Sequence, residues 1–152
     1  MSGFTFAETM SGSYFLDEAP QRDLAMSFTV KVEVHSLSRF VRDRMATIEG
    51  EVVLEGRADH RALRGTLEMD LLLGRKLRYE FDFVDDAGRK CRFAGQKDVE
   101  FTRLMHTMTT LPGELVADGT RFATATVRFD ARSDLGAFLG SFRPLGLPGF
   151  RR

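Results

Sequence analysis

The sequence predicts one all-β domain, an antiparallel up-and-down barrel of about eight strands with two short helices. Apolar and polar residues alternate along most of the chain, a pattern typical of strands that bury one face. Short links that contain glycine separate the alternating segments, which favours antiparallel pairing of consecutive strands. The chain has 14 Phe, 2 Tyr and no Trp, and this composition predicts a large apolar interior. A two-sheet β-sandwich is the alternative, because alternation alone does not separate it from a barrel.

The strands follow from the alternation in chain order. In residues 24–35 every even-numbered position from Leu24 to Val34 is apolar, and in residues 76–86 the odd-numbered positions from Leu77 to Phe83 are apolar. The predicted strands cover residues 4–14, 24–35, 48–56, 62–73, 76–86, 89–99, 102–111 and 121–130. A meander of this kind can close on itself and remove its edges, so residues 1–152 are predicted to form a single domain.

Turns and helices account for the segments between the strands. The predicted turns lie at Gly74-Arg75, at residues 85–88 and at Asp118-Gly119, and the Leu-Pro-Gly run after Thr110 indicates a strand end and a turn. Ser36 is a predicted cap for a helix over residues 37–45, with Leu37, Phe40 and Val41 on one face. A second helix is predicted over residues 135–142, capped by residue 133 or 134. Both helices are short, so we expect packing on the barrel to stabilise them.

Two charged residues fall on faces that are otherwise apolar. Glu8 shares the face of Phe6 and Met10, and Lys97 shares the face of Cys91 and Phe93. An isolated buried charge is costly, so each must be paired, neutralised or open to a wet cavity. Either the two meet inside the barrel or one faces a polar group of a ligand. The alternative is that Glu8 lies at a bulge in solvent while Lys97 extends to a barrel mouth.

Three inward glycines and one inward cysteine have structural interpretations. Gly50, Gly65 and Gly95 are predicted to relieve crowding at bends or to leave room for large neighbouring side chains. Cys91 lies beside Phe93 and has no histidine neighbour, which favours a small buried hydrophobe over a nucleophile. As the only cysteine, it also excludes an intrachain disulfide.

No catalytic, metal or nucleotide motif is present. The histidines His35, His60 and His106 are scattered without the spacing of a metal site, and the sequence predicts no cofactor. Lys plus Arg total 22 and so do Asp plus Glu, so a long-range field for nucleic acid or an anionic membrane is not expected. No signal sequence and no run of ~20 apolar residues is visible, which predicts a soluble, cytoplasmic protein without a membrane span.

Several short segments together resemble a known β domain. They are the opening FTFAETMSGSY, the aromatic strand with Gly95 and Lys97, the Thr109-Thr110-Leu111 run and the closing segment DLGAFLGSFR. The chain resembles the accessory β domain of bacterial cholesterol-oxidase-like oxidoreductases of the glucose–methanol–choline type. No flavin-binding fingerprint is present, so the resemblance implies only an accessory module for sterol-like or lipid substrates. The strand plan is also similar to lipocalin-like barrels, as an analogy of architecture.

Three functional hypotheses follow. The first is a non-enzymatic module that binds a hydrophobic small molecule or serves a partner oxidoreductase or hydrolase. The second is a cofactor-free isomerase or cyclase in which Glu8 is the acid or base and Lys97 stabilises negative charge. The third is a filled, structural barrel that acts through its outer surface. An apolar interior pocket above ~300 Å³ separates the first two from the third. The candidate ligand-binding residues are Glu8 and Lys97 as polar contacts and Phe6, Phe28, Tyr79, Phe81 and Phe93 as walls.

Overall fold

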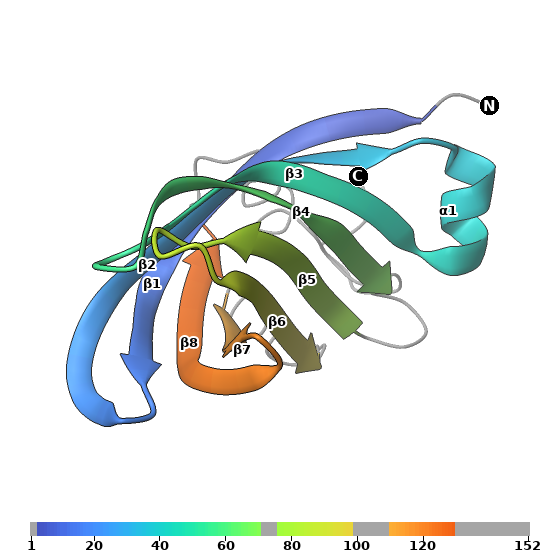
Figure 1. Ribbon diagram of the computed structural model, residues 1–152. Helices are drawn as coiled ribbons and strands as arrows, with labels where there is room; N and C mark the ends of the chain where they lie inside the picture. The colour runs from blue at the N-terminus through green and yellow to red at the C-terminus, as the bar shows by residue number, and fades with distance from the viewer. Residues whose placement is uncertain (1–2, 71–75, 99–109, 130–152) are drawn as a thin grey trace.

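The structure is a closed barrel of eight antiparallel strands, as a computed structural model shows for residues 3–70, 76–98 and 110–129 (Figure 1). Each strand pairs with the next one in the chain, and β1 pairs with β8 to close the barrel. The elements are β1 (Phe4–Leu16), β2 (Ala19–Val34), α1 (Leu37–Asp43), β3 (Met45–Leu54), β4 (Ala58–Asp70), β5 (Lys76–Val84), β6 (Lys90–Asp98), β7 (Thr110–Ala117) and β8 (Thr120–Phe129). The predicted barrel is therefore confirmed, and the sandwich alternative is wrong.

The alternation correctly predicts which side chains point inward. All six even-numbered positions from Leu24 to Val34 in β2 are buried, as are the four odd-numbered positions from Leu77 to Phe83 in β5. Charged residues occupy the other face of β5, where Arg92 of β6 bonds to Asp82 at 2.8 Å. Because the pleat has a period of two, one register places every apolar residue of a strand inside.

The middle of the barrel is filled with aromatic rings. The ring of Phe28 lies 5.0 Å from that of Phe81 and 5.8 Å from those of Tyr79 and Phe93, measured between ring centroids. Phe81 also contacts Phe93 at 5.2 Å. These rings come from β2, β5 and β6, so they join opposite walls of the barrel, and all four side chains are buried. We refer to Phe28, Tyr79, Phe81 and Phe93 as the aromatic cluster.

Glycine allows the strands to approach closely and to bend. A Cβ atom on Gly50 would lie 2.0 Å from the carbonyl oxygen of Thr29, and one on Gly65 would lie 1.9 Å from that of Glu80. No side chain fits in such a space, so both positions require glycine for the close approach of the adjacent strand. At Gly95 the missing Cβ leaves room for the ring of Phe93. The predicted structural role of these three glycines is confirmed.

The seventh strand lies further along the chain than the predicted strand at residues 102–111. Residues 99–109 lie outside the described part of the chain, and the turn predicted after Thr110 is wrong because Thr110–Ala117 forms β7. The strand tolerates Pro112 because the ladder with β6 runs only from Ala117 to Gly113, so Pro112 lies just beyond that ladder. Pairing with β8 covers the whole of β7.

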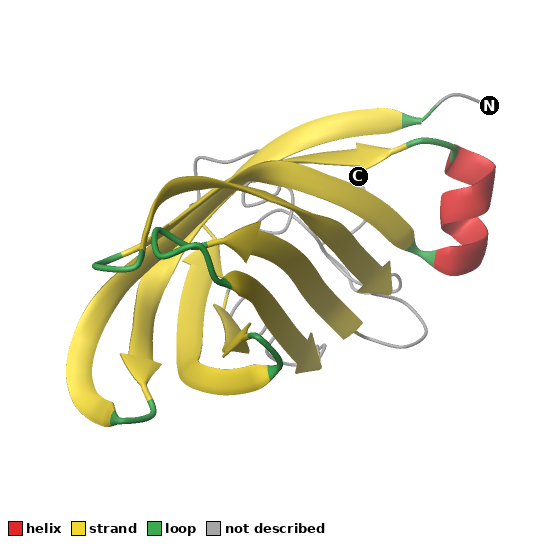
Figure 2. Ribbon diagram, viewed as in Figure 1, coloured by secondary structure: helices red, strands yellow, loops and turns green. Residues whose placement is uncertain are grey.

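The helix α1 is shorter and less buried than predicted. The Ser36 side chain accepts the N–H of Arg39, which confirms the cap, but the helix ends at Asp43 because Arg44 adopts a left-handed conformation with φ 61°. None of its residues is buried; Phe40 is half-buried and packs against the core, whereas Leu37 and Val41 are exposed. Figure 2 shows α1 at one end of the barrel, beside the start of β1. The second predicted helix and the Gly74-Arg75 turn lie outside the described residues.

The described turns between strands gather at the opposite end from α1 (Figure 2). Asp118 and Gly119 both have positive φ, as the predicted tight hairpin between β7 and β8 requires. The predicted turn at residues 85–88 is also present, with Gly88 at φ 85° and its N–H donated to the carbonyl of Asp85. We call the two ends of the barrel the helix end and the turn end.

Candidate functional site

Glu8 lies inside the barrel near the helix end. Its side chain is 1% exposed, and Phe6 and Met10 flank it on the inward face of β1. Val30 is its partner across the β1–β2 ladder. The inward position predicted from the alternation is confirmed, and the alternative of a solvent-exposed bulge is wrong because β1 runs without a register shift past Glu8.

Tyr79 is the hydrogen-bond partner of Glu8. The Tyr79 hydroxyl donates to Glu8 Oε1 at 2.6 Å and also lies against Glu8 Oε2. The two residues are 71 positions apart in the chain, and barrel closure brings β1 and β5 together across the interior. Tyr79 is fully buried, and burial together with the adjacent carboxyl raises its pKa well above the ordinary value, so the phenol keeps its proton.

Burial controls the protonation state of Glu8. Removal from water raises the pKa of Glu8 from 4.5 to about 8, and the hydrogen bond from Tyr79 offsets only part of that rise. At neutral pH the side chain is therefore an uncharged carboxylic acid. It carries one O–H donor besides its acceptor oxygen, so the Glu8–Tyr79 pair can both donate to and accept from a third polar group.

The pair lies close to the seam that closes the barrel. Among the described residues, the β1–β8 ladder runs from Met10 to Leu16, so it begins two residues after Glu8. The ring of Phe129, at the end of β8, lies 6.2 Å from that of Tyr79. Glu8 is thus next to the point where β1 and β8 meet, above one side of the aromatic cluster.

The structure brings most of the predicted wall residues together. Phe28, Phe81 and Phe93 contact one another in the aromatic cluster, and Tyr79 joins that cluster to Glu8. Phe6 is half-buried and stacks on the ring of Phe4 at 6.1 Å.

The pairing predicted between Glu8 and Lys97 stays a prediction. In the backbone, Lys97 pairs with Leu77 across the β5–β6 ladder. Its side chain lies outside the part of the chain that the structure describes. The partner that the structure gives Glu8 is the Tyr79 hydroxyl.

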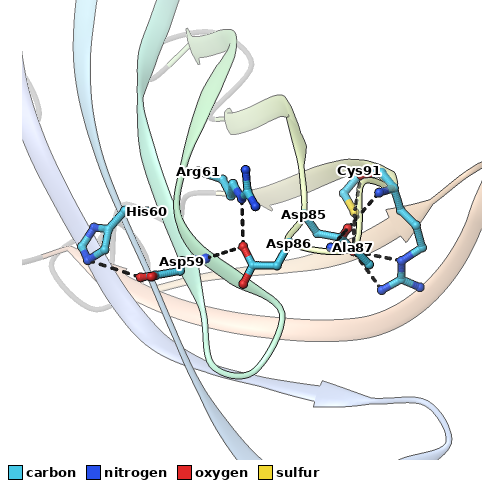
Figure 3. A network of polar contacts seen from close by, with 8 residues as sticks. Asp59, His60, Arg61, Asp85, Asp86, Ala87 and Cys91 are labelled. Atoms are coloured by element: carbon cyan, nitrogen blue, oxygen red, sulfur yellow. Dashed lines mark hydrogen bonds and ion pairs between the residues drawn. The ribbon is translucent and has the colours of Figure 1, made fainter.

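A second buried acid, which the sequence analysis did not identify, lies at the turn end. Asp85 is 2% exposed, and its carboxylate accepts the backbone N–H groups of Ala87 and Arg89 at 3.0 and 2.8 Å (Figure 3). The Arg89 guanidinium adds a bond from Nε at 2.9 Å. Burial alone would raise the pKa of Asp85, but these hydrogen bonds and the positive charge of Arg89 hold it below the ordinary 3.8. The sequence feature that indicates this site is an Asp at the start of a tight turn with an Arg four positions later.

The remaining polar groups near Asp85 are structural. Asp86 accepts from Arg61 at 2.8 Å and from the N–H of Asp59, which ties the β3–β4 and β5–β6 turns together (Figure 3). Cys91 is buried beside Asp85, and burial followed by the negative charge of Asp85 raises its thiol pKa to about 11. The thiol is therefore protonated at neutral pH, as expected for a packing residue and not for a nucleophile.

An open hollow of about 650 Å³ lies at the turn end. Tyr14 and Leu24 contribute its apolar lining, and Arg57 and Asp86 are among the charged residues around it. The Tyr14 hydroxyl donates to the carbonyl of Glu55 at 2.5 Å, which fixes this side chain in the wall. The hollow contains neither Glu8 nor Tyr79, so it is separate from the interior pair.

Within the described ranges, no three His, Cys, Asp or Glu side chains are grouped as a metal site would require. In the same ranges no helix is long and apolar enough to span a bilayer. The chain matches no protein-family model, no curated protein and no solved structure with significance. The chemistry of the interior is therefore the basis for assigning a function.

Proposed function

We propose that the chain is a non-enzymatic module that binds a hydrophobic, lipid- or sterol-like small molecule through the Glu8–Tyr79 pair. One observation carries the proposal: an uncharged, hydrogen-bonded carboxylic acid lies in an otherwise apolar interior, next to the closing seam. The expected ligand is an apolar body with one hydroxyl or carbonyl group, because that group would complete the hydrogen bonds of Glu8 and Tyr79.

The cost of keeping Glu8 supports a role beyond packing. A carboxyl group that must be neutralised in order to fold destabilises the protein at any pH above its ordinary pKa. An apolar side chain at this position would avoid that cost, although it would leave the buried Tyr79 hydroxyl without its partner. A residue that lowers stability at neutral pH is typical of a binding site.

The aromatic cluster supplies the apolar part of the proposed site. Phe28, Phe81 and Phe93 are packed against one another and fill the interior below Glu8, so a ligand that reaches the Glu8–Tyr79 pair has to displace part of this packing. Phe6, which is half-buried, lies on the same face of β1 as Glu8. A floor of phenylalanine gives contact area and no hydrogen bonds, so the position of the ligand's polar group depends on Glu8 and Tyr79 alone.

The resemblance to accessory domains of cholesterol-oxidase-like enzymes supports the same ligand class. It adds the proposal that the module serves a partner oxidoreductase or hydrolase by holding the substrate. The proposed location remains the cytoplasm.

An isomerase or cyclase is the second candidate, because the pKa of Glu8, about 8, is suited to proton transfer near neutral pH. In that case Glu8 would protonate a carbonyl or alkene of the ligand, and its carboxylate would later recover the proton. A binding module returns its ligand unchanged, whereas an isomerase converts it to a product of the same mass that chromatography separates.

Native mass spectrometry of freshly purified protein tests the proposal. We expect wild type to carry a co-purified adduct or to bind added sterols and long-chain alcohols. Glu8→Met, which keeps the length of the side chain and removes the hydrogen-bonding group, should lose that adduct, and Tyr79→Phe should weaken it. Glu51→Gln, an exposed carboxyl on β3, is the matched control and should bind like wild type. Equal binding by Glu8→Met and wild type, or no binding by wild type, would overturn the proposal.

A further inference from the structure

An apolar surface lies on and beside α1 at the helix end. Four large hydrophobic side chains are exposed among the described residues, and three of them are here: Phe4, Leu37 and Val41, which are 42, 37 and 64% exposed. Leu37 and Val41 are four residues apart on α1 and so share one face of the helix. The Phe4 ring meets the edge of Phe40 at 6.2 Å and joins this face to β1.

Two arginine side chains lie on the polar side of the same helix, turned away from Leu37 and Val41. Arg39 and Arg42 are exposed on the same short helix, and neither guanidinium takes part in an ion pair with a described residue. Arg44, by contrast, lies 3.8 Å from Asp70. The acidic residue of the helix, Asp43, uses its carboxylate to accept the N–H of Met45. The helix therefore presents exposed apolar groups on one side and, on the other, two arginines that are unpaired among the described residues, and with the negative charge of Asp43 its net charge is positive by one.

We propose that this surface, the α1 patch (Phe4, Leu37, Phe40 and Val41 with Arg39 and Arg42), docks on anionic phospholipid bilayers. Apolar side chains on one side of a helix and arginines on its polar side match the interfacial region of such a membrane, where the apolar side chains enter the acyl boundary and the long arginine side chains reach the lipid phosphates. The proposal goes beyond ligand binding and does not depend on the Glu8–Tyr79 pair.

The zero net charge of the chain determines the kind of binding that results. It gives no long-range attraction, so the protein reaches the membrane by diffusion and binds through contact. Each of the two arginines should strengthen binding to an anionic surface by about fivefold. Added salt weakens this electrostatic contribution. Binding is therefore weak, reversible and dependent on anionic lipid.

The absence of tryptophan allows a direct test. Val41→Trp places the only indole of the protein in the patch, and Val84→Trp places it at the fourth exposed hydrophobic position, on β5, as a matched control. With vesicles of phosphatidylcholine and phosphatidylserine, we expect the emission of Val41→Trp to shift to shorter wavelength and that of Val84→Trp to stay unchanged. Vesicles of phosphatidylcholine alone should give a much smaller shift.

Vesicle flotation of the otherwise unaltered chain provides the second readout. The double variant Arg39→Gln with Arg42→Gln should bind about 25-fold more weakly. Leu37→Ser with Val41→Ser should bind at least tenfold more weakly, whereas Arg22→Gln and Val84→Ser should bind like wild type. No vesicle binding, or equal binding by patch and control variants, would overturn the proposal. So would a Val41→Trp shift that depends on protein concentration without vesicles, which would indicate that a second copy of the chain covers the patch.

Discussion

The two buried acids among the described residues lie toward opposite ends of the barrel and have opposite pKa shifts. Asp85 and Glu8 are similarly inaccessible, at 2 and 1% exposure. The pKa of Asp85 lies below 3.8, whereas that of Glu8 is raised to about 8. Strand β5 lies next to both acids. Its residue Tyr79 bonds to Glu8, and its last residue, Val84, precedes Asp85.

The difference follows from the donors around each acid and from the depth of each site, because Asp85 lines the open hollow at the turn end and Glu8 lies in the apolar interior. Asp85 receives two backbone N–H groups and a guanidinium, which replace the water it loses. Glu8 receives one phenol hydroxyl, which is too little to keep the charge. Asp85 therefore stabilises the turn end as a carboxylate, while Glu8 near the helix end has to be neutralised on folding and lowers stability at neutral pH.

The aromatic cluster between these ends should show the largest effect of a single change. Phe81 contacts Phe28, Phe93 and Phe83 at ring-centroid distances of 5.0 to 5.9 Å, so Phe81→Ala leaves a cavity that these rings cannot close. We expect a loss of ~3–5 kcal/mol in the free energy of unfolding, measured by urea denaturation. A loss below ~1 kcal/mol would mean that the site is not packed.

Asp85→Ala should cause the next largest loss in the free energy of unfolding, about 2–4 kcal/mol. The change leaves two backbone N–H groups and the Arg89 side chain without their hydrogen-bond acceptor. The native contribution of Asp85 has a definite pH dependence. Its pKa is lowered on folding, so its stabilisation is present above about pH 4 and is lost as the pH falls below 3.8. Urea melts at pH 3 and pH 6 check this: wild type and Asp85→Ala should differ less at pH 3, and an equal difference would contradict the account.

Glu8→Gln should increase the free energy of unfolding at neutral and higher pH, whereas the two preceding substitutions decrease it. The pKa of Glu8 is raised on folding, so its contribution is fully favourable below pH 4.5 and is lost as the pH rises toward about 8. Glutamine does not titrate, so the variant avoids the cost of neutralising the carboxyl group on folding. Its amide brings an additional buried N–H, which offsets part of that gain, so the variant should be more stable than wild type by about 2 kcal/mol near pH 8. Near pH 4 the two should be nearly equal. A variant less stable than wild type at both pH values would indicate that Glu8 is a structural residue.

Tyr79→Phe should have the smallest effect on stability, about 1 kcal/mol, because it removes one hydrogen bond and keeps the ring in the aromatic cluster. The change also removes the interaction that lowers the pKa of Glu8. The stability loss of wild type with rising pH should therefore extend to higher pH in the variant. An unchanged pH profile would show that Tyr79 does not influence the ionisation of Glu8.

The sequence predicts the barrel and its inward faces because a period of two in β2 and β5 leaves one register that buries the apolar residues. It predicts β7 poorly, because Pro112 and Gly113 resemble a turn and only pairing with β8 and β6 makes the segment a strand. The inward position of Glu8 follows from alternation, but its contact with Tyr79 depends on how the closed barrel staggers its strands. The sequence does not predict the role of Asp85, because its main donors are backbone N–H groups of its own turn, which leave no pattern of side chains.

Direct titration of Glu8 tests the central claim, that an uncharged carboxylic acid is kept inside this barrel. Carbon-detected NMR of side-chain carboxyl groups, with Glu8→Gln to assign the resonance, gives the pKa in the folded protein. The account predicts a Glu8 midpoint of about 8, shifted upward in Tyr79→Phe. A Glu8 midpoint near the ordinary 4.5 would mean that the acid is charged at neutral pH, and the proposed recognition of a neutral, hydrophobic ligand would lose its basis.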